Sequence, residues 1–205
     1  DSRQVYRYMD IGTAKPTREE QSLVPHHLID VVDPNKSFSL ALYQDLAHKT
    51  INDLHNRGKL PFLVGGSGLY VWAVLEGWSI PHVPPNAQIR QELEARAKSA
   101  GIDALYKELK ELDPKAARQI DPRNLRRTIR ALEVCRSTGK PFSELKGKNP
   151  PGLDTPIIGL TVERSELYRR VDSRVDNMIE HGLIDEVRGL IDRGYSPDLP
   201  SMSSV

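Results

Sequence analysis

Hydrophobic residues recur at two different spacings along the chain, and these spacings predict different elements. Over 39–57 the apolar positions follow the period of an α-helix. The short apolar runs 27–32 and 60–64 instead have the length and composition of β-strands. A glycine-rich turn, 65–68, follows the second run and leads into an apolar helix predicted over 69–75. Strand, helix, strand, glycine-rich turn and helix in this order are typical of a parallel α/β sheet.

Beyond residue 81 the pattern changes to a charged, helix-rich stretch that reaches about residue 145. Its helices are expected to be short, because helix-breaking residues interrupt it at Gly101, Pro114, Pro122 and Gly139. We therefore expect an α/β core over 1–80 and 151–205, with a helical insertion domain over 81–150.

The core is expected to resume after a linker rich in glycine and proline over 146–156. A third apolar run, 157–162, predicts a strand. Two amphipathic helices are then predicted over 165–181 and 183–193.

Composition narrows the class of protein. With 205 residues, 38% hydrophobic and 28% charged, the chain is long and apolar enough to fold around its own core. The longest apolar runs, such as 70–75, are far shorter than a membrane span, so no membrane association is expected. The single cysteine, Cys135, excludes an internal disulfide framework and fits a reducing, cytoplasmic compartment.

Positive charge is concentrated in one part of the chain. The net charge is +1, yet Lys115 to Lys148 contains ten Lys or Arg residues against three acidic ones, a local net of +7. The helical spacing of the arginines in this stretch predicts one shared face with free guanidinium groups, formed by Arg123, Arg126, Arg127 and Arg130. Guanidinium groups suit phosphate oxygens, so nucleic acid or a diphosphate is a candidate ligand. A solvated basic surface paired with nearby carboxylates remains the alternative.

The turn formed by Gly65, Gly66, Ser67 and Gly68 is a candidate anion site. Glycines between a strand and a helix let backbone N–H groups approach an anion, and Ser67 adds a hydroxyl. The alternative is a tight turn that only permits close packing. No Gly-x-x-x-x-Gly-Lys-Ser/Thr phosphate loop occurs in the sequence, so no nucleoside-triphosphate site is predicted.

The segment Asp1-Ser2-Arg3-Gln4 combines a carboxylate, a hydroxyl, a cation and an amide. Such a set could hydrogen-bond a base edge and accept a proton, although an ordinary polar terminus has the same composition. The histidines and acids at 26, 27, 30, 48 and 55 match no compact zinc pattern, so we predict no metal site from them. Cys135 is expected to pack in the core.

Several motifs together resemble the tRNA dimethylallyltransferase family. The match runs in order along essentially the whole chain, over residues 1–6, 9–17, 25–30, 63–70, 126–134, 174–178 and 182–187. The resemblance implies a P-loop-type parallel sheet core, incomplete at the N-terminus, with a helical insertion domain that contacts tRNA. It also implies transfer of a dimethylallyl group from dimethylallyl diphosphate to N6 of the adenosine 3′ of the anticodon. The implied cofactor is Mg²⁺, and the implied partner is the tRNA anticodon stem-loop. The resemblance also implies a monomer.

The resemblance assigns roles to residues of this chain. Asp1 matches the general base and Ser67 a second catalytic position, where the family usually has threonine. The tRNA-binding residues would be Asp1, Ser2, Arg3, Gln4, Arg126, Arg127, Thr128, Ile129 and Arg130. The diphosphate-binding residues would be Gly65, Gly66, Ser67, Gly68, Arg127 and Arg130.

The family's phosphate loop has no counterpart in these residues, and the chain starts at Asp1 without methionine. We therefore expect a fragment that is inactive by itself and supplies no metal ligands. Two alternatives of other classes stay open: a noncatalytic RNA-binding module that uses the arginine face alone, and a P-loop nucleotide or metabolite kinase.

Overall fold

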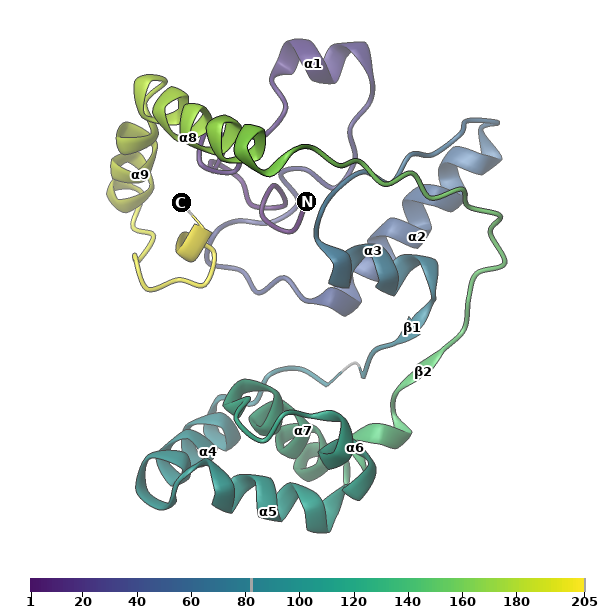
Figure 1. Cartoon of the computed structure of the whole chain (residues 1–205), viewed down its shortest axis with the longest axis vertical. Coiled ribbons are helices and arrows are strands. Elements are labelled where there is room, and N and C mark those ends of the chain that lie inside the picture. The colour runs from purple at the N-terminus through teal and green to yellow at the C-terminus, as the bar shows by residue number, and fades with distance from the viewer. Residues whose placement is uncertain (82, 205) are drawn as a thin grey trace. The chain divides into compact units, whose positions relative to one another are not determined.

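The computed structural model describes residues 1–81 and 83–204 and divides the chain into two compact units (Figure 1). The first unit contains Asp1–Leu75 and the chain from Gly152 onward, and the second contains Glu76–Pro151. The predicted domain boundaries, after residues 80 and 150, lie five residues and one residue from these.

The second unit is a helical bundle. Its helices are α4 (Ala87–Ala100), α5 (Ile102–Leu112), α6 (Pro114–Gln119) and α7 (Leu125–Thr138). Helix α5 packs against the other three, and α4 also packs against α7 (Figure 1). Gly101, with a φ of 82°, separates α4 from α5, and Pro114 begins α6. The prediction of short helices interrupted at glycine and proline is confirmed, and leucines at 93, 105, 109 and 132 form their buried core.

The chain enters and leaves the second unit through adjacent segments. Strands β1 (Trp78–Ser79) and β2 (Gly147–Lys148) pair antiparallel, with Trp78 opposite Lys148. The 3₁₀ turn η1 (Phe142–Glu144) precedes β2. Strand β2 lies within the segment 146–156 that the sequence predicted to be a linker.

The helices predicted in the first unit are confirmed. They are α2 (Leu40–Asn56), α3 (Gly68–Leu75), α8 (Arg164–Glu180) and α9 (Leu183–Asp192). The unit also contains the helix α1 (Arg18–Leu23) and the 3₁₀ turn η2 (Met202–Ser204). Ser39 caps α2, since its Oγ accepts a hydrogen bond from the Leu42 N–H at 3.1 Å. Among the described residues, no helix has both the length and the apolar character required to cross a bilayer.

The predicted parallel sheet is not found in the described residues, and this expectation is corrected. Residues 60–64 and 157–162 are not in strands, and within 27–32 only Val32 forms a bridge, parallel to Tyr6. The apolar side chains of the first two segments lie in solvent: Phe62 is 81% exposed and Leu160 is 95% exposed. A strand requires a neighbour for its N–H and C=O groups, and composition alone does not supply one.

The N-terminal segment is anchored in the core of the first unit. Val5, Tyr6 and Met9 are buried in one cluster with Leu190 of α9 and Met202. The backbone beside them is also paired, because the Val31 N–H donates to the Val5 carbonyl at 2.8 Å and the Asp30 N–H to the Gln4 carbonyl at 3.1 Å. The polar segment Asp1–Gln4 is therefore attached to a buried, hydrogen-bonded part of the first unit.

Candidate active site

The Asp1–Gln4 segment presents an exposed carboxylate on a held backbone. Asp1 Oδ1 accepts a hydrogen bond from the Arg3 backbone N–H at 2.7 Å. Arg3 Nη1 donates in turn to the Pro200 carbonyl at 2.9 Å. The first bond folds the carboxylate over its own segment, and the second ties the segment to the C-terminal part of the unit. An exposed carboxylate in this setting can accept a proton from a bound nucleophile.

The glycine-rich turn lies beside this segment. The Ser67 Oγ donates a hydrogen bond to the Ser2 Oγ at 3.3 Å, so residues 65 positions apart meet. The turn runs directly into α3, whose first residue is Gly68. A Cβ added at Gly65 or Gly66 would meet no other atom within 4 Å, so the backbone there is open to a ligand. An anion at this turn would face the N-terminal end of a helix, which favours negative charge.

The Gln4 side chain is already engaged inside the protein. Its Nε2 donates to the carbonyls of Thr13 and Ala14, at 3.1 and 2.8 Å. Because two carbonyl acceptors require both amide hydrogens, only the Gln4 carbonyl oxygen remains for another partner. The predicted contact of Gln4 with a base would therefore use it as an acceptor.

The predicted arginine face is wrong for Arg123. Helix α7 begins at Leu125 with Asn124 as its N-cap, so Arg123 lies before the helix. Its guanidinium binds the Asp121 carboxylate through Nε at 3.1 Å and Nη2 at 2.9 Å. These bonds lower the pKa of the Asp121 carboxyl to about 2. The i, i+3, i+4, i+7 spacing extended the predicted helix two residues beyond its true N-terminal end.

Arg130 is also not the free guanidinium that was predicted. Its Nη1 donates to Glu133 Oε2 at 2.7 Å, and its Nη2 donates to the Val83 carbonyl at 2.9 Å. The Glu133 side chain is fully buried and binds Arg90 as well. Arg130 therefore takes part in a buried ion-pair network, because a buried carboxylate requires charged partners.

Arg126 and Arg127 remain exposed on α7. In the part of the chain that the structure describes, neither guanidinium has a carboxylate partner. Lys146 lies nearby, and its pKa is lowered by desolvation and, in addition, by the positive charge of Arg127. These cations are available to phosphate groups.

Thr128 and Ile129 lie on the inner side of the same helix, with exposed fractions of 0% and 6%. The side chains of these two residues are therefore too buried in this structure to make the predicted contacts with tRNA. The Thr128 Oγ1 has no hydrogen-bond partner within the described residues. The other predicted roles of residues in this unit stay predictions.

The histidines do not gather into a site. The His26 Nδ1 lies 2.7 Å from the Val24 carbonyl and the His48 Nε2 lies 3.1 Å from the Val74 carbonyl. Over residues 1–81 and 83–204, no group of three or more His, Cys, Asp or Glu side chains is placed to hold a metal ion. Cys135 is buried, and burial raises the pKa of its thiol.

Two residues near the site were missed by the sequence reasoning. The Lys15 side chain is only 3% exposed, and its Nζ donates to Asp10 Oδ1 and Asp30 Oδ1 at 2.6 and 2.7 Å. The Glu186 carboxylate binds the backbone around Asp10. Both residues lie inside motifs of the family resemblance, but nothing in their spacing indicates that the two motifs meet.

Comparison with known proteins places these observations in a family. A family model described as IPP transferase matches residues 4–205. The tRNA dimethylallyltransferase of Roseiflexus sp. is 58% identical over all 205 residues, which cover 67% of that protein. The protein of the same name from Thermomicrobium roseum is 50% identical, and the chain covers 62% of it.

Solved structures agree with this comparison. The tRNA isopentenylpyrophosphate transferase of Bacillus halodurans is 51% identical, with a TM-score of 0.61 over 99% of this chain and 63% of its own. A eukaryotic dimethylallyltransferase acting on tRNA is 28% identical, with a TM-score of 0.74 over 97% of this chain and 50% of its own. The chain thus spans between half and two thirds of the proteins that it matches.

Proposed function

Because this chain belongs to the IPP transferase family, we propose that it forms part of an enzyme that modifies tRNA by prenyl transfer. The reaction would move a dimethylallyl group from dimethylallyl diphosphate to N6 of the adenosine 3′ of the anticodon. The observation that supports this proposal is the Ser2–Ser67 hydrogen bond, which joins the segment that contains Asp1 to an open glycine-rich turn at a helix start.

The chemistry requires a proton acceptor and a place for the leaving group. N6 of adenine would attack the allylic carbon, forming a C–N bond while the C–O bond to diphosphate breaks. Asp1, ionised at neutral pH, would take the proton that N6 releases. Ser2, Arg3 and the carbonyl oxygen of Gln4 would contact the extruded base, as suits chemistry on a loop nucleotide.

The leaving diphosphate would be held by backbone donors of residues 65–68 and by the Ser67 hydroxyl. Negative charge develops there in the transition state, so fixed donors at this position lower the barrier. Arg127 and Arg130 belong to the second unit, and their part in binding the diphosphate stays a prediction from the family resemblance. Ser67 can donate the same hydrogen bond as threonine at this position.

The second unit is proposed to contact the tRNA anticodon stem-loop. Arg126 and Arg127 are exposed cations suited to backbone phosphates. A monomeric enzyme in the cytoplasm remains our prediction.

The family resemblance also implies Mg²⁺. The described residues, 1–81 and 83–204, form no cluster of three or more metal-ligating side chains, and Mg²⁺ stays an expectation from the resemblance. We assign no step of the reaction to the metal.

The experiment uses a full-length chimera, in which these 205 residues replace the matching part of the Roseiflexus sp. relative. The chimera is incubated with radiolabelled dimethylallyl diphosphate and an anticodon stem-loop, and the RNA is digested to nucleosides. The label should appear on the adenosine 3′ of the anticodon. A matched stem-loop with inosine at that position, which lacks the exocyclic amine, should remain unlabelled. Equal labelling of both RNAs, or labelled phosphate transfer from a nucleoside triphosphate, would overturn the proposal.

A further inference from the structure

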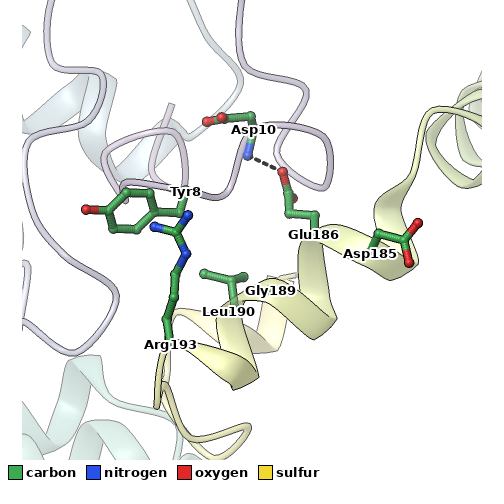
Figure 2. A pocket seen from close by; sticks show the side chains of 7 residues that line it. All are labelled: Tyr8, Asp10, Asp185, Glu186, Gly189, Leu190 and Arg193. Atoms are coloured by element: carbon green, nitrogen blue, oxygen red, sulfur yellow. Dashed lines mark hydrogen bonds between the residues drawn. The ribbon is translucent and has the colours of Figure 1, made fainter.

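Two motifs that the sequence left without a role meet in the first unit. Glu186 lies in the first turn of α9, and its carboxylate accepts hydrogen bonds from three consecutive backbone N–H groups. Oε2 accepts from Asp10 and Ile11, both at 2.7 Å, and Oε1 accepts from Gly12 at 3.0 Å. Figure 2 shows the Glu186 side chain directed at the Asp10 backbone. Consecutive N–H groups that converge in this way form a concave anion site, filled here by a side chain of the same unit.

The turn held by Glu186 carries unusual backbone geometry. Tyr8 and Ala14 have φ values of 67° and 47°, in the left-handed region that residues with a Cβ rarely occupy. Leu28 and Asp30, on the paired segment, have φ values of 61° and 54°. Such conformations persist only where the surroundings fix them, and they concentrate at functional sites.

The same turn fixes the segment that contains Asp1. Gln4 donates both amide hydrogens to the carbonyls of Thr13 and Ala14. Lys15, at the end of the turn, donates to the Tyr6 carbonyl at 2.9 Å and joins the carboxylates of Asp10 and Asp30. A continuous series of hydrogen bonds therefore runs from Glu186 through the turn to Gln4.

We propose that Glu186 is a positioning residue that holds the 10–15 turn, and through it the Asp1–Gln4 segment, in the geometry required for prenyl transfer. This role rests on the function proposed above for Asp1. Glu186 touches neither the base nor the diphosphate in this account, and acts only through the turn. Loss of its carboxylate leaves three N–H groups without their acceptor and releases the turn, so the proton acceptor is misplaced while Arg126 and Arg127 of the second unit are unaffected.

The surroundings of Glu186 allow the test. Glu186 lines a cavity of about 250 Å³ together with Tyr8, Leu190 and Arg193, among others (Figure 2). Glutamine has nearly the same size and shape as glutamate, so it fits at position 186. Glutamine keeps one acceptor oxygen, so Glu186→Gln should preserve part of what Glu186→Ala removes. The neighbouring Asp185 is exposed, and within the described residues its ion-pair partner is Arg188, which makes Asp185→Asn a matched control.

The test compares these three variants in the full-length chimera by steady-state kinetics. Glu186→Ala should lower kcat by about 10- to 100-fold while KM for the stem-loop changes by less than about threefold. Glu186→Gln should recover part of kcat, and Asp185→Asn should match the parent. The N–H groups of residues 10–12 should exchange faster in Glu186→Ala, less so in Glu186→Gln, and at the parent rate in Asp185→Asn.

Several results would overturn the proposal. An unchanged kcat in Glu186→Ala, an equal loss in Asp185→Asn, or a loss confined to KM each contradicts a positioning role. If Glu186→Ala does not fold, Glu186→Gln decides, since it must show an intermediate kcat. Transfer that survives in Asp1→Asn contradicts the proposed function instead, and the exchange measurement then still decides whether Glu186 holds the turn.

Discussion

Glu133 offers a strong test of how the second unit is held together. Its side chain is fully buried and accepts four hydrogen bonds, which link α4 to α7. The donors are the Asn86 N–H at 2.7 Å, Arg90 Nε at 2.8 Å, Arg90 Nη2 at 3.0 Å and Arg130 Nη1 at 2.7 Å. We consider Glu133→Gln, which keeps the shape and one acceptor, and Glu133→Ala, which removes everything.

The expected loss in the free energy of unfolding depends on which hydrogen bonds each substitution removes. Hydrogen bonds to charged groups contribute about 1.5–3 kcal/mol each when buried. The Arg90 and Arg130 side chains are 39% and 31% exposed, so water solvates them after the substitution and reduces the cost. Glu133→Gln loses the charge and about two of the four bonds, which should lower the free energy of unfolding by about 2–3 kcal/mol. Glu133→Ala also leaves the Asn86 N–H unpaired and opens a cavity, for a loss of about 3–5 kcal/mol.

Native-state hydrogen exchange, followed by mass spectrometry on the 205-residue chain, measures this effect locally. Peptides from α4 and α7 should lose protection in both variants, whereas peptides from α9 in the first unit should not change. Glu94→Gln, an exposed change on α4, should stay within about 0.5 kcal/mol of the parent. Protection of α4 and α7 in Glu133→Gln within about 0.5 kcal/mol of the parent would refute the reasoning, because the buried ion pairs would then contribute nothing.

Two further predictions concern the same unit. Burial opposes ionisation of Glu133, but hydrogen bonds from Arg90 and Arg130 outweigh it and hold its pKa below the ordinary value. A lowered pKa in the folded state means that the stabilisation is present above the unfolded-state pKa of about 4.3 and is lost as the pH falls through the lower folded-state pKa. Exchange protection of α4 and α7 should therefore drop below about pH 4.3 in the parent and less in Glu133→Gln, and equal acid sensitivity would contradict this. Gly77 has a φ of 55°, and a Cβ there would lie 1.9 Å from the Asn149 carbonyl oxygen. Gly77→Ala should therefore destabilise the β1–β2 ribbon by about 2 kcal/mol or more, measured as faster exchange of the Asn149 N–H. Gly139 also has a positive φ, but a Cβ there would meet no atom within 4 Å, so Gly139→Ala should cost only about 1–2 kcal/mol.

The helices were predictable because each carries its own signal. Ser39 before α2, Gly101 between α4 and α5, and Pro114 at the start of α6 act through local geometry, so spacing and cap residues define the boundaries. The strands carry no such local signal. Segments 60–64 and 157–162 have strand composition, but pairing depends on neighbours far along the chain, and the described residues provide none for them.

The site was predictable only in part. The family resemblance predicted Asp1 and Ser67 as catalytic residues. In the structure Ser67 forms a hydrogen bond with Ser2, the residue that follows Asp1 in the sequence. Spacing could not distinguish exposed Arg126 from Arg130, whose partner Glu133 is buried three residues later. The contact of Glu186 with residues 10–12 spans more than 170 positions, so it follows from the folded structure alone.

The central claim is that the Asp1 carboxylate accepts the proton from adenosine N6. The most direct measurement is the single-turnover rate of prenyl transfer by the Asp1→Asn variant of the full-length chimera, with stem-loop RNA already bound. The control is Asp154→Asn, a change at an exposed position of the predicted linker. Our account predicts a rate about 10²- to 10⁴-fold below the parent with unchanged RNA affinity. A rate within about twofold of the parent would contradict it.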